Sequence, residues 1–231
     1  MKIRIISVNS GDLNDFDSVQ SFGHIIEDGK KLRYQVRRNI IKEFISSNNF
    51  PIDIFDAVTP NKFQIKNNNV YYKSKKLEVS DNSEFYISNI LSHYEIWNIN
   101  EDTLILEDDI ILDRLQLEEI KNLIKSFEKI ELTNKILYLQ LSTPWHESFF
   151  DKDFNLEPFD GNFGRYLSGD LSGTSAMFLT RECKKIILSS LLPLCACDKY
   201  FDNLRSLGIL QFYLPIDKSK MIKLDKNTSW L

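Results

Sequence analysis

The acidic run Glu107-Asp108-Asp109 is the feature of this sequence best suited to chemistry. Apolar residues flank it on both sides, which favours a buried strand end over the alternative, a solvated turn of acids. Adjacent carboxylates repel each other, and burying even one is costly unless it is paired. A divalent cation removes that difficulty, because hard oxygen ligands with open positions suit Mg²⁺ or Mn²⁺. The run therefore predicts a metal site.

The spacing of the three acids predicts which of their side chains face the same way. Side chains alternate between the two faces of an extended segment, so Glu107 and Asp109 are expected to point one way and Asp108 the other. We expect Glu107 and Asp109 to hold the metal. Asp108 is then left for a backbone group or a ligand.

Strands and helices alternate along the chain, and the acidic run follows one of the strands. Patterns of apolar residues predict strands at 2–8, 52–55, 103–106, 136–141, 174–180 and 209–214 and helices from 31, over 84–98, around 120–127, over 182–192 and over 198–207. This alternation predicts an α/β fold with a Rossmann-type, mainly parallel sheet flanked by helices. Ligands bind beyond the carboxyl ends of the strands in such sheets, where the acidic run stands.

The chain of 231 residues has no repeat, low-complexity segment or linker, so we expect a single domain. Residues 59–83 are interpreted as a surface excursion with a small hairpin around 70–72. Residues 142–170 form a long, aromatic candidate binding loop. Its Trp145, Phe149 and Phe150 are expected either to stack on a ligand or to hold the loop to the core.

Composition argues against several classes of protein, although a local basic patch would survive the argument from net charge. Lys and Arg number 29 against 33 Asp and Glu, and a net charge of −4 gives no basic field for nucleic acid. Cys183, Cys195 and Cys197 fit neither a disulfide framework nor a zinc site, which indicates a reducing compartment. No apolar run approaches the roughly 20 residues of a membrane span, and the first one is too short for a signal peptide. We expect a cytoplasmic protein, with peripheral membrane contact left open.

Two runs beside the acids carry a resemblance to a known family. Leu-Ser-His-Tyr-Glu-Ile-Trp at 91–97 and Leu-Ile-Leu-Glu-Asp-Asp-Ile at 104–110 resemble the LSHxxxW and LEDD signatures of glycosyltransferase family 25. That family includes bacterial lipooligosaccharide galactosyltransferases and collagen hydroxylysine galactosyltransferases. Looser matches lie at 6–9, 55–58 and 173–179. Residues 11–30 look like an insertion and 83–88 lack a glycine usual in the family, which bears on the acceptor more than on the reaction.

The resemblance implies a GT-A-like fold and an inverting, metal-dependent glycosyltransferase. Such an enzyme would use Mn²⁺ or Mg²⁺ to move a hexose, galactose or glucose, from a UDP-sugar to a glycan or hydroxylysine acceptor. Residues 1–112 would form mainly the donor and metal side of the single domain over 1–231, and residues 113–231 mainly the acceptor side.

The resemblance and the residue chemistry together give a set of candidate site residues. Asp198, which matches the family's late acid, is the candidate general base, and Asp170 is its rival. Guanidinium groups suit a diphosphate, and the resemblance implies an acid beside the uracil or ribose. The candidates for donor binding are Ser7, Asn9, Arg37, Arg38, Asp56, His93 and Asp108.

Each of these residues also has a purely structural interpretation. Arginine runs often form a solvated helix face, and a lone histidine on an apolar stripe is commonly structural. An acid is favoured at a helix start by the helix dipole alone, which applies to Asp198. Asp56 is equally explained as an ordinary acid at a strand end.

Two other functional classes stay open. A metal-dependent phosphohydrolase or phosphotransferase also needs clustered carboxylates at a strand end, and phosphate release from simple esters would favour it. A non-catalytic nucleotide-sugar-binding module would bind the donor without turnover. In that case Asp198→Ala would change nothing measurable.

Overall fold

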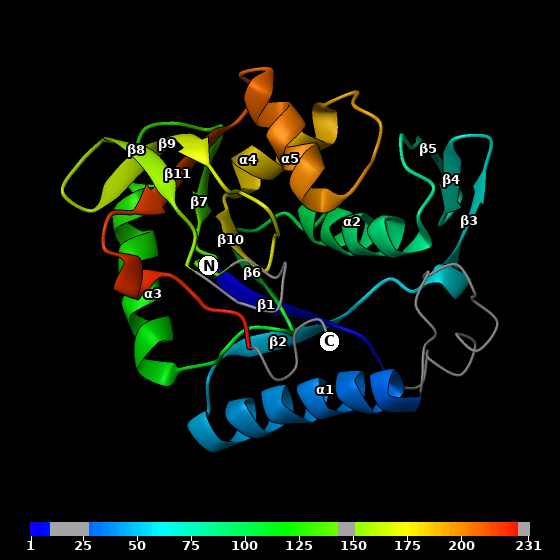
Figure 1. The fold of residues 1–231 in the computed structure, drawn as a ribbon, viewed down its shortest axis with the longest axis horizontal. Helices are drawn as coiled ribbons and strands as arrows, with labels where there is room; N and C mark the ends of the chain where they lie inside the picture. The colour runs from blue at the N-terminus through cyan, green and yellow to red at the C-terminus, as the bar shows by residue number, and fades with distance from the viewer. Residues whose placement is uncertain (10–27, 143–150, 226–231) are drawn as a thin grey trace.

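The computed structural model describes residues 1–9, 28–142 and 151–225 and, in the first helix, the side chains from Tyr34 onward. A large sheet with the strand order β2-β1-β6-β10-β7-β11-β9-β8 runs through it, with helices on both faces (Figure 1). Its strands are β1 (Lys2–Ser7), β2 (Ile52–Asp56), β6 (Thr103–Glu107), β7 (Lys135–Tyr138), β8 (Phe154–Pro158), β9 (Phe163–Gly169), β10 (Ala176–Leu179) and β11 (Gln211–Pro215).

Five α-helices occupy the described residues, close to the expected positions. They are α1 (Asp28–Asn48), α2 (Glu84–Trp97), α3 (Arg114–Glu128), α4 (Arg181–Ser189) and α5 (Cys197–Ser206). Side-chain caps explain two of the starts: Asp113 accepts from the backbone N–H of Gln116 at 2.7 Å, and Thr180 accepts from that of Cys183 at 3.1 Å. None of the helices in the described ranges is both long and apolar enough to cross a membrane.

Two apolar cores cover the two faces of the sheet. Residues of α2, α4 and α5, such as Ile90, Ile187 and Leu204, are buried on one face. Residues of α1 and α3, such as Ile41 and Ile120, are buried on the other. The α/β interpretation is therefore confirmed as a sheet between two helical layers.

The expectation of a mainly parallel sheet is only partly right. β1 runs parallel to β2 and β6, and β11 runs parallel to β7. β10, however, is antiparallel to both of its neighbours, and β8 and β9 add an antiparallel edge. The sheet is mixed because β10 enters between β6 and β7 in the opposite direction. A run of four buried apolar residues carries no information on strand direction.

Two segments interpreted as irregular contain strands. Residues 59–83 hold a separate sheet of β3 (Phe63–Lys66), β4 (Asn69–Tyr72) and β5 (Lys75–Glu78), which extends the expected hairpin. The predicted long loop over 142–170 was wrong from 154 onward, where β8 and β9 pair as a hairpin. Trp145, Phe149 and Phe150 lie outside the described residues.

Candidate active site

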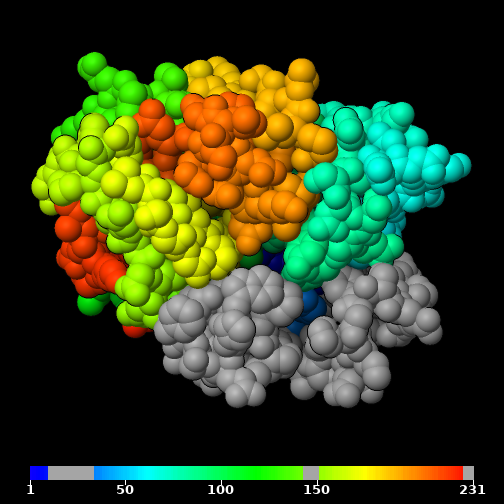
Figure 2. Space-filling model, turned by 45° about the horizontal axis from the view of Figure 1, so that its top comes forward, coloured from blue at the N-terminus to red at the C-terminus, as the bar shows by residue number. Residues whose placement is uncertain are grey.

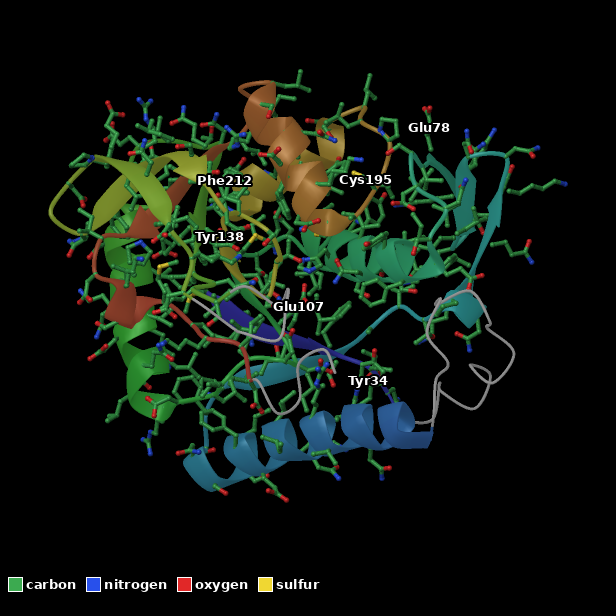
Figure 3. All side chains as sticks on the ribbon, in the orientation of Figure 1. Tyr34, Glu78, Glu107, Tyr138, Cys195 and Phe212 are labelled. Atoms are coloured by element: carbon green, nitrogen blue, oxygen red, sulfur yellow. The ribbon has the colours of Figure 1, made fainter. Side chains whose placement is uncertain are left out.

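Three parallel strands end together at the edge of the sheet that carries the acidic run. In the strand register Ser7 of β1 pairs with Asp56 of β2, and Ile6 pairs with Glu107 of β6. The sheet therefore brings the ends of these strands to one place. Figure 3 shows Glu107 there, between α1 and α2.

The acidic run itself is not extended. β6 ends at Glu107, and Asp108 and Asp109 form a turn. The ladder with β10 ends at Leu106, and the pairing with β1 ends at Glu107. The alternation expected for the three side chains therefore does not apply, and each acid has its own surroundings.

Glu107 is held by hydrogen bonds to both carboxylate oxygens. Thr174 Oγ1 donates to Oε1 at 2.7 Å, His93 Nε2 at 3.0 Å and Asn89 Nδ2 at 3.3 Å. Ser175 Oγ donates to Oε2 at 3.3 Å. Burial works to raise the pKa of Glu107, but the bond and charge from His93 and the other donors outweigh it and lower the pKa. Glu107 thus joins α2 to the segment before β10.

Asp108 faces the opposite helical layer. Arg37 of α1 lies 3.2 Å from Asp108 Oδ1, and each side chain is only 10% exposed. Burial raises the pKa of Asp108, although the charge of Arg37 opposes the rise. The other oxygen, Oδ2, makes no close hydrogen bond and neither does Arg37 Nε, although the Ser7 hydroxyl and the backbone N–H of Val8 lie near enough to Asp108 to lower its pKa. The pair therefore keeps an acceptor and a donor without a close partner.

Asp109 has the most strongly raised pKa of the three acids. Burial, followed by the charge of Glu107, raises its pKa to about 7, and Asp108 adds to the rise. Its Oδ1 is also buried without a partner. In the absence of a cation, this carboxyl group is therefore harder to ionise than an ordinary aspartate.

A second arginine joins the ends of β1 and β2. Arg38 donates to Asp56 Oδ1 at 2.5 Å and to the carbonyl oxygen of Ser7 at 3.2 Å. The Asp56 side chain is 52% exposed, so one of its oxygens can reach a ligand. Ser7 is buried, and its Oγ makes no close hydrogen bond, although it lies near enough to Asp108 to lower the pKa of that carboxyl group. Asn9 follows at the end of the described N-terminal segment and is half-buried.

The two candidate bases lie at the other end of the site, joined by the loop at 170–175. Asp198 stands in the first turn of α5, and its Oδ2 accepts from the backbone N–H of Gly173 at 3.2 Å. Asp170 accepts from the N–H of Ser172 at 2.7 Å. Gly173 has a φ of +81°, and a Cβ there would meet Gln140 Nε2 at 2.6 Å. The loop therefore needs glycine at this position.

Several polar residues of the site were not among the sequence predictions. Thr174 and Ser175, which bind Glu107, stand in the family-like run at 173–179, so that run carried a signal. Asn89 lies one helical turn before His93. Lys152 and Tyr138 were missed altogether, because a lysine in a loop and a tyrosine ending an apolar strand have no distinctive pattern.

His93 of α2 lies against Glu107. Its side chain is fully buried, with Nε2 on Glu107 and Nδ1 without a partner. A residue in this position supports Glu107 more readily than it contacts a ligand.

The unpartnered oxygens provide a test of whether a divalent cation fits. Within the described residues no group of three or more His, Cys, Asp or Glu side chains forms a complete metal cage. Asp108 and Asp109 nevertheless each have one buried carboxylate oxygen without a close hydrogen bond. Mg²⁺ is commonly held by one or two carboxylates together with substrate phosphates. Two carboxylates with such an oxygen are present, and Glu107, already supplied with donors, is less available.

Figure 2 shows the face on which α5, β9 and α2 meet, with blue atoms of the N-terminal part of the chain visible between them. Residues from both halves of the sequence therefore lie on one face.

Comparison with known proteins agrees with this arrangement. The sequence model of glycosyltransferase family 25, described as an LPS biosynthesis protein, matches residues 32–188, more than half of the chain. The match includes Arg37, Asp56, the acidic run and the loop at 170–175. No match was found among curated proteins. The sequence-based prediction of a glycosyltransferase is confirmed: the chain belongs to glycosyltransferase family 25.

Proposed function

We propose that this glycosyltransferase is a single GT-A-like domain that moves a hexose from a UDP-sugar to a glycan or hydroxylysine acceptor, with inversion and with a divalent cation. The observation that supports the proposal is the set of buried polar atoms without a close hydrogen-bond partner on Arg37, Asp108 and Asp109, next to the ends of three parallel strands. Buried polar atoms of this kind need a partner, and a cation with a diphosphate supplies one.

The donor side is assigned to residues 1–112. Arg37 is proposed to contact the diphosphate, since its Nε is free of protein partners and guanidinium groups suit phosphate. Asp56 is proposed to accept from the uracil or ribose, with Arg38 holding it in place. Ser7, which pairs with Asp56 in the strand register, and Asn9 beyond it are proposed to join this contact.

Asp109 and Asp108 are proposed to hold Mn²⁺ or Mg²⁺ through their unpartnered oxygens. The bound cation would neutralise charge that develops on the departing nucleoside diphosphate. The earlier assignment of Glu107 as a ligand gives way to a supporting role, because its four donors favour a fixed carboxylate. His93 supports Glu107 in turn.

The acceptor side is assigned to residues 113–231. Asp198 is proposed as the general base that takes the proton from the acceptor hydroxyl as its oxygen attacks the anomeric carbon. The Gly173 N–H bond to Oδ2 orients the carboxylate. Asp170 lies in the same region and is the second candidate. Family membership favours transfer over the phosphohydrolase and binding-module alternatives.

The test is an assay of sugar transfer by the purified protein. UDP-galactose and UDP-glucose are offered with Mn²⁺ or with a chelator, to a deacylated lipooligosaccharide or to a hydroxylysine peptide. We expect a glycosylated product from one donor only when the metal is present, and its anomeric configuration, read by NMR, should be inverted. Phosphate release from simple esters with no sugar transfer would overturn the proposal.

A further inference from the structure

Among the side chains that the structure describes, three lysines are almost completely buried, and two of them have an evident structural task. Lys135 donates to the carbonyl oxygen of Phe127 at 2.5 Å and to that of Ile130, at the end of α3. Lys184 donates to the carbonyl of Ile96 at 3.2 Å and to others beyond the end of α2. A cation there satisfies the free carbonyl groups of a helix terminus and suits its dipole.

Lys152 is the third buried lysine and does not cap a helix. Its Nζ donates to the Tyr138 hydroxyl at 2.6 Å and to the carbonyl oxygen of Ser172. Both partners are neutral, and the side chain is fully buried. Burial lowers the pKa of Lys152 to about 8, against the attraction of Asp170 and Asp198. The ammonium group therefore has the two candidate bases as its compensating charges, and the attraction is mutual.

The hydrogen bonds of Lys152 and of its partner Tyr138 lead to the loop at 170–175, which lies between the two candidate bases and the acidic run. The Tyr138 hydroxyl donates to the carbonyl of Ser172 at 3.0 Å or to that of Gly173 at 3.3 Å. Tyr138 lies above Glu107 in Figure 3, on the strand next to β10. One buried lysine and one buried tyrosine thus fix two successive carbonyl groups of this loop.

The same loop connects both halves of the proposed site. The N–H of Gly173 binds Asp198, and the next two residues, Thr174 and Ser175, donate to Glu107. A shift of the loop therefore moves the base and the support of the acidic run together. Displacement by about 1 Å of a group that orients a reaction can lower the rate about 100-fold.

We propose that Lys152 is a positioning residue of the transferase: together with the Tyr138 hydroxyl it holds the loop at 170–175 in place. This inference rests on the proposed function for its effect on turnover. Its effect on the loop is independent of that function, and the experiment separates the two.

The experiment compares Lys152→Met with Lys184→Met, which removes an equally buried ammonium group from a helix end. Hydrogen exchange of residues 170–176 and the kinetics of sugar transfer are measured for both, at a temperature where both are folded. For Lys152→Met we expect exchange in this loop about ten-fold faster. We also expect kcat lower by about 10- to 100-fold, with the dissociation constant of UDP and Mn²⁺ changed less than about two-fold. Lys184→Met should leave both the loop and kcat unchanged.

Tyr138→Phe keeps the ring and removes the hydroxyl, and it provides the same test if Lys152→Met does not fold. Wild-type exchange and wild-type kcat in the variant that folds would overturn the inference, as would an equal loss of kcat in Lys184→Met. If the wild-type protein transfers no sugar, the proposed function fails, whereas the exchange comparison still decides whether Lys152 holds the loop.

Discussion

Glu107→Gln is the substitution that tests the arrangement of the acidic run most simply. It keeps the shape of the side chain and removes its charge. Four donors bind the carboxylate, from Asn89, His93, Thr174 and Ser175. The lowered pKa of Glu107 means that these donors outweigh the cost of burying the charge.

The expected loss of stability follows from the difference between charged and neutral hydrogen bonds. Such bonds contribute about 1 kcal/mol more each to stability when the acceptor is charged, so four of them amount to about 4 kcal/mol. Relief of charge burial and of repulsion against Asp109 offsets part of that sum. We therefore expect Glu107→Gln to lower the free energy of unfolding by about 2 kcal/mol, or roughly 4–8 °C in Tm for a chain of this size.

Thermal unfolding followed by circular dichroism, together with urea unfolding, measures this change. Glu157→Gln is the matched control, because Glu157 pairs with Arg165 on the surface and is 52% exposed. The control should change stability by less than about 1 kcal/mol, as exposed ion pairs do. If Glu107→Gln is no more destabilising than this control, the described hydrogen bonds do not hold the acidic run, and the reasoning is refuted.

Three further predictions concern the surroundings of the site. Gly173→Ala should lower the free energy of unfolding, measured in urea, by about 1–3 kcal/mol more than Gly208→Ala. Both glycines have positive φ, but of the two only Gly173 has other atoms within contact distance of an added Cβ. Equal losses of stability in the two variants would contradict this. Arg37→Ala should weaken UDP binding by about ten-fold in calorimetry. It should also lower the free energy of unfolding by about 3–5 kcal/mol, because it leaves the Asp108 charge buried without its partner. Wild-type affinity for UDP would show that Arg37 is not part of the donor site. Burial, then the charge of Arg4, lowers the pKa of Lys184 from 10.5 to about 8, so the unfolded chain binds more protons between these values. Above pH 8 the free energy of unfolding of the wild type should therefore rise relative to that of Lys184→Met, by up to about 1.4 kcal/mol per pH unit. A difference in stability between the two proteins that stays constant from about pH 7.5 to 10 would contradict the burial of the charge.

The sequence predicted the elements that have a clear period or a clear end. Apolar spacing located α1 to α5, and the short β-branched runs located β1, β2 and β6. The carboxyl ends of those strands brought Ser7, Asp56 and Glu107 to one edge, as an α/β sheet requires. This part was predictable because local pattern and sheet geometry together decide it.

Strand direction and long-range side-chain contacts were not predictable in the same way. Nothing in the run Ala176–Leu179 distinguishes a parallel from an antiparallel strand, and β8 and β9 are half exposed, with weak patterns. The role of Lys152 depends on Tyr138, 14 residues away, and on Ser172, 20 residues away. Such contacts follow from tertiary packing, which composition and residue spacing do not predict.

The different roles of the three acids in the acidic run could also not be predicted from the sequence. Alternation in an extended strand assigned Glu107 and Asp109 to one side, but the strand ends at Glu107. The number of donors around each carboxylate decides which of them is free, and those donors come from α1, α2 and the loop before β10. The sequence located the acids, while only the fold shows which oxygens lack partners.

The central claim is that Asp109 and its neighbours bind a nucleotide sugar together with a divalent cation, and thermal stability tests it most directly. The wild type and Asp109→Asn are heated with a panel of nucleotide sugars, with Mn²⁺ or with a chelator. A ligand at about 100 times its dissociation constant stabilises the native state by about 2.7 kcal/mol, or roughly 5–11 °C here. We predict such a rise for the wild type with one UDP-sugar and Mn²⁺ only, and none for Asp109→Asn. An equal rise in the folded variant, or no rise in the wild type with any nucleotide sugar, would contradict the account.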